Sequence, residues 1–324
     1  MPHLLIAGKL HPAGIAHLST VEARGWSYTH VQSVDQNEML AELPNADALI
    51  IRTQPLTAEI IASAPKLKFV SRHGVGYDVI DTEALSTRGI PLAIVGDVNS
   101  ISAAEQAVTL MLAAAKRVNR GDQAVRSTAN WEWRNALEAI EVSGKNLFLV
   151  GFGRIGQRVA QMMQGFSMTI SAYDPFISAT DWPSPSVKQL SSLEEGLEWA
   201  EIVSLHLPSL DHVLLGENEL QRMTRGAIVI NAARGGLIDE VALKEALLSG
   251  HIGAAGLDVF ETEPPRADHP LASCDTAVLS PHIGGISNDA AKRMALKSID
   301  NVLDYFADTL APELIVNPNY SEAT

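Results

Sequence analysis

The stretch LFLVGFGRIG, from Leu147 to Gly156, restricts the possible folds more than any other part of this sequence. Its apolar start favours a buried strand, and the glycines at 151, 153 and 156 lead from that strand into a helix-forming segment. The first glycine permits a tight turn, the second lets a phosphate approach the backbone, and the third lets helix and strand pack closely. Free N–H groups at the helix N-terminus favour an anion. The stretch therefore predicts a strand–turn–helix unit that binds the pyrophosphate of a dinucleotide, with Gly151, Gly153 and Gly156 in contact with it.

An acidic residue at the end of the next strand-like segment indicates which dinucleotide is bound. Asp174 ends the segment TISAYD, eighteen residues after Gly156. A carboxylate at about this distance accepts hydrogen bonds from the ribose hydroxyls and repels a 2′-phosphate. Pro175 and Phe176 bring no positive charge that could hold such a phosphate. The sequence therefore predicts NAD rather than NADP, against the simpler alternative of a glycine turn followed by a solvated aspartate.

Strand-like and helix-like segments alternate along the whole chain. Apolar segments typical of buried strands occupy 4–7, 48–51, 68–71, 91–95, 147–150, 168–173, 202–207, 227–231, 253–258 and 277–280. The longer helical patterns occupy 57–64, 102–118, 154–165, 239–249 and 288–306. Such alternation predicts right-handed crossovers and parallel sheets, and 324 residues favour two domains that share a cleft. The predicted fold is α/β, with two Rossmann-like doubly wound parallel-sheet domains and the active site in the cleft between them.

Composition excludes several classes of function. Hydrophobic residues make up 46% and charged residues 19%, as in soluble globular proteins. A net charge of −14 and the lack of a basic run argue against a nucleic-acid surface. The single cysteine, Cys274, cannot form an internal disulfide and fits a reducing compartment. We expect no secretory leader and no membrane-spanning segment, and therefore a cytoplasmic protein.

Three short segments in the second half are rich in residues that ordinary packing does not need. They are NAARGGLIDE (231–240), GLDVFETEPP (256–265) and SPHIGG (280–285), and each follows a predicted strand. Taken singly, Arg234 could be an ion-pair partner, Glu263 a solvated loop residue and His282 a core histidine. Together they place a fixed cation, a carboxylate and an imidazole at the carboxyl edge of one sheet, where ligands bind in open α/β folds. The set indicates a catalytic site.

These segments resemble the motif series of the D-2-hydroxyacid dehydrogenases. ARGGLIDE, LDVFETEPP and PHIGG occur in family order after SRHGVGYDVID (71–81) and NSISAAEQ (99–106), so the resemblance runs from about residue 48 to residue 282. Within the family, the segments look most like the catalytic part of the 3-phosphoglycerate dehydrogenases, without the long regulatory extension that some of these carry. The resemblance implies a discontinuous substrate-binding, flavodoxin-like domain of residues 1–98 plus 289–324, and an NAD-binding Rossmann domain of residues 99–288. It also implies a homodimer, which the apolar segment 102–118 favours.

The resemblance assigns a role to each of the three candidate catalytic residues. His282 becomes the general acid and base, Glu263 its partner, and Arg234 the group that binds the substrate carboxylate. Elementary chemistry agrees, because histidine can give or take a proton near neutral pH and a nearby carboxylate favours its charged form. The planar guanidinium of arginine suits a carboxylate and stays charged.

Further contacts follow from the resemblance alone. The backbone N–H groups of Val75 and Gly76 would bind the substrate carboxylate. The cofactor contacts would be Arg154 and Ile155 at the pyrophosphate, Ala232, Asp258 and Gly285 at the nicotinamide, and His206 and Pro208 at the adenosine. Asp258 has a simpler interpretation as a cap for a helix or loop. No metal site is predicted.

Two arginines bear on the identity of the substrate. Arg52 and Arg72 end predicted strands of the first domain, and two such cations suggest a second anionic group, such as a phosphate or sulfonate. In 3-phosphoglycerate dehydrogenases the matching positions help to hold the substrate phosphate, although surface ion pairs are the simpler interpretation here. Trp133 stands where the family pattern suggests a cation. We therefore expect 3-phosphoglycerate and phosphohydroxypyruvate as substrates, with a hydroxypyruvate or glyoxylate reductase, a sulfolactate or phosphite dehydrogenase, or an NAD-sensing corepressor-like protein as alternatives.

Overall fold

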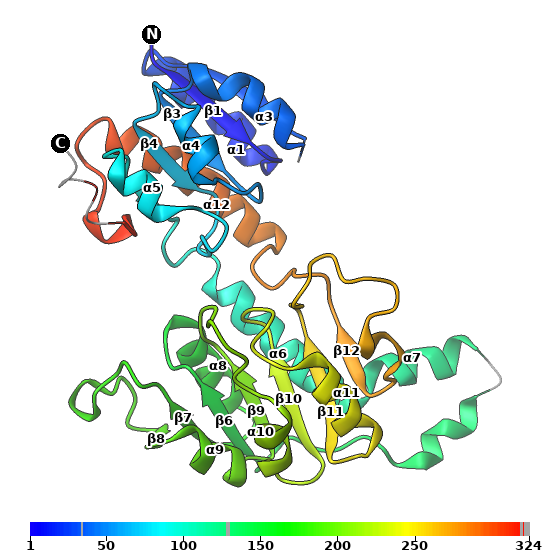
Figure 1. The fold of residues 1–324 in the computed structure, drawn as a ribbon. Helices are drawn as coiled ribbons and strands as arrows, with labels where there is room; N and C mark the ends of the chain where they lie inside the picture. Colours follow the sequence, from blue (N-terminus) through cyan, green and yellow to red (C-terminus); the bar gives the residue numbers. More distant parts are fainter. Residues whose placement is uncertain (34, 128–129, 318–319, 321–324) are drawn as a thin grey trace. The chain divides into compact units, whose positions relative to one another are not determined.

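The chain folds into two compact units, each with its own parallel sheet (Figure 1). The computed structural model describes residues 1–33, 35–127, 130–317 and 320. Unit 1 combines residues 1–99 with 285–324, which Figure 1 draws in blue to cyan and in orange to red, and unit 2 is the continuous stretch 100–284. The predicted domain boundaries, after 98 and after 288, differ from these divisions by one and four residues. The roles of the two domains stay predictions.

Unit 1 is a five-stranded parallel sheet with helices on both faces. The strands lie in the order β2-β1-β3-β4-β5. Their bounds are β1 His3–Ala7, β2 Ser27–Val31, β3 Ala48–Ile51, β4 Phe69–Arg72 and β5 Leu92–Ala93. The helices are α1 Pro12–His17, α2 Ser19–Ala23, α3 Gln36–Glu42, α4 Ala58–Ala62, α5 Thr82–Thr87 and α12 Asn288–Tyr305. Alternate residues of β1 face opposite layers, with Leu5 in one apolar core and Leu4 in the other, as the two-residue period of a strand requires.

Helix α12 joins the C-terminal part of the chain to this sheet. It packs against β3 and β4, and its residues Ala295, Ile299 and Val302 belong to the same apolar core as Leu4. The rings of Phe69 and Tyr305 stack with centroids 4.3 Å apart. Unit 1 is therefore built from two stretches of chain, because α12 covers one face of a sheet whose strands come from the first hundred residues.

Unit 2 is a seven-stranded parallel sheet in the order β12-β11-β10-β9-β6-β7-β8. Its strands are β6 Asn146–Val150, β7 Thr169–Tyr173, β8 Lys188–Gln189, β9 Ile202–Leu205, β10 Ala227–Asn231, β11 Ile252–Leu257 and β12 Ala277–Leu279. Its helices are α6 Ser100–Lys116, α7 Val118–Arg126, α8 Arg154–Gln164, α9 Leu193–Trp199, α10 Glu217–Arg222 and α11 Glu240–Leu248. Apolar side chains fill a core on each face, and the central strands are buried throughout, as parallel sheets covered on both sides require.

The predicted α/β class and the parallel sheets are confirmed, with differences in particular elements. β2 and β8 were not predicted, because their short segments carry little apolar periodicity. The helices α1 to α3, α5, α7, α9 and α10 were not predicted with bounds of their own. The strand predicted at 91–95 has only the two residues of β5. The apolar segment 102–118, which favours a homodimer by its sequence, corresponds to α6, whose buried face packs on α8, β10 and β11 of its own unit. Among the described residues, no helix combines the length and the hydropathy that a membrane span needs.

Candidate active site

The predicted cofactor and catalytic residues of unit 2 follow the carboxyl ends of its strands. The residues concerned are Gly151 after β6, Asp174 after β7, His206 after β9, Arg234 after β10, Asp258 after β11 and His282 after β12. Parallel strands end at one edge of a sheet, so the fold gathers these positions there. The chain leaves β6 on the side of β7 and later returns to β9 on the other side. This reversal is the switch point at which open α/β sheets bind ligands.

The three glycines of the loop after β6 differ in what surrounds them. Gly151 has φ +92°, and a Cβ on it would lie 2.3 Å from the carbonyl oxygen of His206. A Cβ on Gly156 would lie 2.4 Å from the carbonyl oxygen of Gly151. At Gly153 no described atom lies within 4 Å of the same position, and its backbone provides the N-cap of α8 without a side-chain hydrogen bond. The outer glycines are therefore required by packing, whereas Gly153 faces open space at a helix N-terminus.

Asp174 connects the glycine loop to the end of β7. Its Oδ2 accepts a hydrogen bond of 2.9 Å from the N–H of Phe152, and its Oδ1 accepts one of 3.0 Å from the N–H of Phe176. The Phe176 side chain is almost fully exposed. The carboxylate therefore lies beside the phosphate-binding loop, where its remaining lone pairs can accept hydrogen bonds from a ribose.

His206 lies on the other side of the same loop. Its Nε2 is 2.9 Å from the hydroxyl of Ser204, and its carbonyl group is the one that excludes a side chain at Gly151. Burial lowers the pKa of His206 to about 4, so its ring is neutral at physiological pH. The next predicted contact, Pro208, is exposed.

The turn that carries Arg234 is held by a residue that the sequence analysis missed. Asn231, the last residue of β10, accepts a hydrogen bond of 3.0 Å from the N–H of Ala233 and donates one of 2.8 Å to the carbonyl of Arg234. The Arg234 guanidinium donates to the carbonyl of Ala233 at 2.8 Å. An asparagine that ends an otherwise apolar strand was the available signal, because a buried amide needs hydrogen-bond partners.

His282 and Glu263 form a hydrogen-bonded pair. Nδ1 of His282 lies 2.6 Å from Oε2 of Glu263, and Oε1 of Glu263 accepts a hydrogen bond of 3.0 Å from the N–H of Phe260. His282 has φ +52°, and its N–H donates to the carbonyl of Ser280 at 3.0 Å. Because Nδ1 is taken by the carboxylate, Nε2 is the ring nitrogen left for a substrate. The structure thus brings the side chains of His282 and Glu263 together.

Asp258 holds the loop that contains His282. It is almost fully buried, and its carboxylate accepts hydrogen bonds from Ser280 Oγ (2.5 Å), from the N–H of Ile283 (3.0 Å) and from the N–H of Gly284 (2.7 Å). Helix α6 adds a hydrogen bond of 2.9 Å from Gln106 to Ser280. Both carboxylate oxygens of Asp258 accept hydrogen bonds within the loop. This arrangement agrees with the simpler interpretation of Asp258 as a loop cap.

Comparison with known proteins identifies the family. Residues 108–284 match the model of the D-isomer specific 2-hydroxyacid dehydrogenase NAD binding domain, and these residues lie within unit 2. The chain belongs to the D-isomer specific 2-hydroxyacid dehydrogenase family. The resemblance seen in the sequence is thereby confirmed.

Individual relatives extend this comparison over the whole chain. D-3-phosphoglycerate dehydrogenase of Mycobacterium bovis is 39% identical over 319 residues, which cover 97% of this chain and 59% of that protein. Hydroxypyruvate reductase of Thermotoga maritima is 37% identical over 277 residues, which cover 84% of this chain and 88% of that protein. The crystal structure of the TT0316 protein from Thermus thermophilus superposes with a TM-score of 0.88 at 34% identity, covering 97% of this chain and 99% of that one. The chain thus spans about 59% of the length of the first of these relatives.

The substrate residues that the family resemblance places in unit 1 lie at the carboxyl edge of its sheet. Arg52 directly follows β3, and Arg72 ends the neighbouring β4, where it pairs with Ile51. The guanidinium of Arg72 donates to the carbonyl of Gly76 at 2.7 Å and to that of Ile51 at 3.3 Å. Arg52 makes one long contact, 3.3 Å, to the carbonyl of Lys9. Arg72 therefore supports the loop that carries Val75 and Gly76.

His73 lies in this loop and was not singled out by the sequence analysis. Its side chain is buried, and neither ring nitrogen has a hydrogen-bond partner among the described residues. The pKa of His73 is lowered to about 4, mainly because burial penalises the charged ring, and the charges of Arg52 and Arg72 act in the same direction. The loop after β4 therefore carries a neutral imidazole next to two arginines.

Two other positions discussed in the sequence analysis are Gly285 and Trp133. Gly285 is the first residue of the second stretch of unit 1, and a Cβ on it would lie 2.9 Å from Nδ2 of Asn99. Trp133 belongs to the surface segment after α7, where its indole N–H donates to Glu138 at 3.2 Å and Arg120 lies over its ring. Most described residues from 118 to 143 are exposed or half-buried, so this segment lies at the surface of unit 2.

Proposed function

We propose that the chain is an NAD-dependent dehydrogenase that interconverts a D-2-hydroxyacid and its 2-ketoacid. The observation that carries the proposal is the 2.6 Å hydrogen bond between Nδ1 of His282 and Oε2 of Glu263, at the same sheet edge as the glycine loop. A carboxylate on Nδ1 orients the ring and leaves Nε2 for proton exchange with a substrate. Relatives of the chain are named D-3-phosphoglycerate dehydrogenase, hydroxypyruvate reductase and glyoxylate reductase.

The residues around the glycine loop fit NAD. Gly153 leaves room for a phosphate, the first N–H groups of α8 suit its charge, and Asp174 lies beside the loop for the adenosine ribose. Bound at this loop, the nicotinamide would supply the hydride acceptor for C2 of the hydroxyacid and, in its reduced form, the hydride donor for the ketone. Unit 2 is accordingly the proposed cofactor domain and unit 1 the proposed substrate domain. The remaining contacts stay predictions, at Arg154, Ile155, His206, Pro208, Ala232, Asp258 and Gly285.

Each catalytic side chain has a distinct task in the proposed reaction. As C2 loses a hydride, Nε2 of His282 takes the hydroxyl proton, so the products are a ketone and a protonated imidazole. Glu263 stabilises that positive charge through Nδ1. Arg234 binds the substrate carboxylate with its planar guanidinium. In the reverse direction, His282 returns the proton to the ketone oxygen.

The proposed substrate carries a second anionic group, with 3-phosphoglycerate and phosphohydroxypyruvate as the first candidates. Arg52 and Arg72 end neighbouring strands at one edge of the sheet, and two cations there favour a phosphate. The relatives named D-3-phosphoglycerate dehydrogenase support this choice.

One observation favours a second candidate, the reduction of hydroxypyruvate or glyoxylate. The guanidinium of Arg72 donates hydrogen bonds to the carbonyl groups of Gly76 and Ile51, as expected of an arginine that supports a loop. If only Arg52 is available to a substrate, a small ketoacid without a distal anion is the better fit.

Substrate preference is tested by NADH oxidation with phosphohydroxypyruvate, hydroxypyruvate, glyoxylate, pyruvate and sulfopyruvate at matched concentrations. A higher kcat/KM for the phosphorylated or sulfonated ketoacid, lost in Arg52→Gln, supports the anion site. Preference for the small ketoacids supports the second candidate. Absence of turnover on all five contradicts the dehydrogenase proposal and leads to tests of phosphite oxidation and of a corepressor-like role.

We further propose that the chain works as a homodimer in the cytoplasm. The surface segment around α7 exposes large apolar side chains, namely Val118, Val125, Trp131 and Leu137, whose burial would favour association. Analytical ultracentrifugation tests the dimer. A monomer at micromolar concentration would contradict it.

A further inference from the structure

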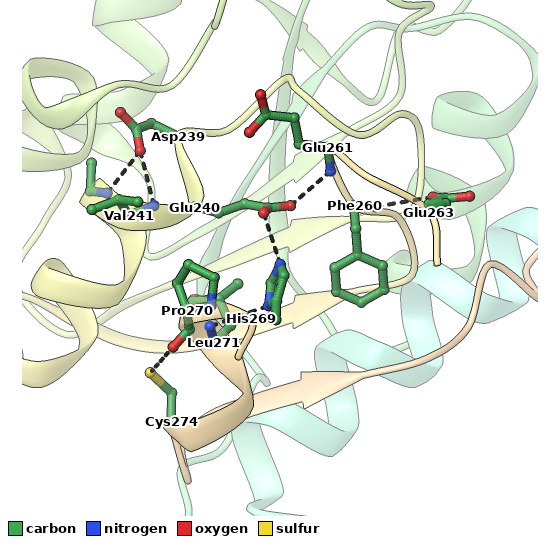
Figure 2. A network of polar contacts seen from close by, with 11 residues as sticks. Asp239, Glu240, Val241, Phe260, Glu261, Glu263, His269, Pro270, Leu271 and Cys274 are labelled. Carbon is green, nitrogen blue, oxygen red and sulfur yellow. Dashed lines mark hydrogen bonds and ion pairs between the residues drawn. The ribbon is translucent and has the colours of Figure 1, made fainter. Parts of the chain in front are cut away.

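A second carboxylate and imidazole meet beside the segment that leads to Glu263. Oε2 of Glu240 lies 2.8 Å from Nε2 of His269, and each side chain is only 10% exposed. Figure 2 shows this pair, with the hydrogen bond that Glu240 accepts from the N–H of Glu261 in the segment that leads to Glu263. Neither Glu240 nor His269 has a role in the proposed reaction.

Glu240 is buried although it opens a helix. It is the first residue of α11, and the preceding residue, Asp239, caps the helix by accepting hydrogen bonds of 2.9 Å from the N–H groups of Val241 and Ala242. Glu240 is therefore not needed as a cap. A buried carboxylate is costly unless its oxygens are hydrogen-bonded. Its position six residues after Arg234 connects it to the arginine turn.

Two successive peptide N–H groups connect Glu240 to the catalytic glutamate. The N–H of Phe260 donates to Oε1 of Glu263 at 3.0 Å, and the next one, of Glu261, donates to Oε1 of Glu240 at 2.9 Å. One short stretch of backbone is thus held between a buried carboxylate and a proposed catalytic one. Any shift of this backbone at Glu261 also moves the N–H group that orients Glu263.

His269 holds the other oxygen of Glu240. Its Nδ1 accepts a hydrogen bond of 3.3 Å from the N–H of Leu271, so the network assigns the ring proton to Nε2, which donates to Glu240. The ring of Phe260 packs edge-on against the His269 ring, with centroids 5.1 Å apart. Glu240 therefore accepts two hydrogen bonds, one on each oxygen. An amide in its place has a single oxygen, so it could accept only one of these bonds, and its NH2 group would face the other donor.

The same backbone segment also touches the arginine turn. A Cβ on Gly235 would lie 1.8 Å from the carbonyl oxygen of Phe260, so the turn after Arg234 and the segment before Glu263 are in direct backbone contact. Glu240, Phe260 and Gly235 thus connect the turn that carries Arg234 with the segment that leads to Glu263.

We propose that Glu240 and His269 are positioning residues that hold residues 260–263, so that Glu263 stays oriented toward His282 and the Arg234 turn keeps its place. This proposal rests on the proposed function, because it concerns the same catalytic residues. Both residues act through Glu263 rather than on the substrate. A displacement of about 1 Å in a catalytic group can reduce a rate by roughly 100-fold, so even a small loosening should be measurable.

The kinetic test compares variants that differ in one hydrogen bond. Glu240→Gln and His269→Leu should each lower kcat about 10- to 100-fold, while the Kd of NADH stays within about twofold, because the glycine loop is untouched. His269→Gln keeps a nitrogen donor toward Glu240 and should stay within about fivefold of the wild-type kcat. His17→Leu is the matched control, since it removes a 2.7 Å imidazole–carboxylate contact with Asp300 in unit 1. It should keep the wild-type kcat.

Hydrogen exchange supplies a readout that does not depend on turnover. In Glu240→Gln, the amides of Phe260 and Glu261 should exchange at least about 10-fold faster than in the wild type, with unchanged exchange in the strands of unit 2. Unchanged exchange at both amides, or faster exchange with an unchanged kcat, would overturn the proposal. Absence of turnover in the wild type would count against the proposed function instead, and the exchange rates would then decide by themselves whether Glu240 holds this segment.

Discussion

At His282, the backbone and the ring are constrained by different neighbours. The residue adopts φ +52°, and its N–H is held by the carbonyl of Ser280, whereas its Nδ1 is held by Glu263. Few residues other than glycine adopt this region, and asparagine does so more readily than alanine. The effect of removing the ring can therefore be distinguished from the effect of backbone strain by comparing alanine with asparagine at this position.

Replacing His282 should abolish proton transfer and leave cofactor binding nearly intact. We expect His282→Ala and His282→Asn each to lower kcat by about 10²- to 10⁴-fold, with little change in the Kd of NADH. His282→Asn should be the more stable of the two, by about 1 kcal/mol, because asparagine tolerates the positive φ. Steady-state kinetics, NADH titration and thermal unfolding check these expectations. A variant that keeps half of the wild-type activity would remove His282 from the mechanism.

Asp174 is the residue that should discriminate between the two nicotinamide cofactors. Asp174→Ala removes the acceptor of two backbone N–H groups and the charge that repels a 2′-phosphate. We expect NADH to bind about 10- to 100-fold more weakly, in line with the loss of a charged hydrogen bond. The ratio of kcat/KM for NADH to that for NADPH should fall. If the ratio of kcat/KM for the two cofactors stays at the wild-type value, another residue recognises the ribose.

At the level of elements, the loops after β10, β11 and β12 support one another. Asn231 holds the arginine turn, Asp258 holds the histidine loop, and the backbone at Gly235 lies against Phe260. None of these loops has regular secondary structure of its own around the catalytic residues. Their conformations therefore depend on contacts with each other.

A methyl group at Gly235 should separate two of these loops. In Gly235→Ala the added Cβ would lie 1.8 Å from the carbonyl oxygen of Phe260, so the backbone must shift. We expect a loss of about 1–3 kcal/mol in the free energy of unfolding, as for overpacking, and a fall in kcat of at least about 10-fold. Gly25→Ala is the control, because Gly25 has φ +78° but no neighbour within 4 Å in unit 1. It should lose stability without losing kcat. Equal kcat values in the two variants would contradict the role of this contact.

For the whole molecule, buried titratable groups make stability depend on pH. Each unit has an apolar core on each face of its sheet. In unit 1, His73 follows β4 and is buried without a partner for its ring among the described residues. Burial lowers the pKa of His73 from 6.5 to about 4. Between these two values the unfolded chain binds more protons than the folded one, so the free energy of unfolding falls as the pH decreases.

This difference can be measured by unfolding at two pH values. From the two pKa values, His73 should make the wild type about 2 kcal/mol less stable at pH 5 than at pH 7. Glutamine in His73→Gln cannot take up the proton. The free energy of unfolding of this variant should therefore fall by about 2 kcal/mol less than that of the wild type between pH 7 and pH 5. Urea unfolding of both proteins checks this, with His212→Gln as the control because the His212 side chain is 63% exposed. An identical pH dependence in the wild type and His73→Gln would contradict the expectation.

Features that depend on neighbouring residues could be predicted from the sequence. The glycine loop and the central strands were predicted because each is specified within a few residues by backbone freedom or by an apolar run. The family could be recognised from the sequence for the same reason, because its motifs are short segments at the ends of strands.

Contacts between residues far apart in the sequence depend on the tertiary fold. The contact of His269 with Glu240, the hydrogen bond from Ser102 to Gly284 and the burial of His73 join or enclose groups that no local pattern connects. From the sequence alone, a glutamate in the first turn of a helix would be expected to be solvated. The carboxylate of Glu240 is instead buried against Glu261, twenty-one residues further along the chain. A side chain's environment depends on the packing of the whole unit, because burial and hydrogen bonding are set by whatever the fold brings within a few ångströms.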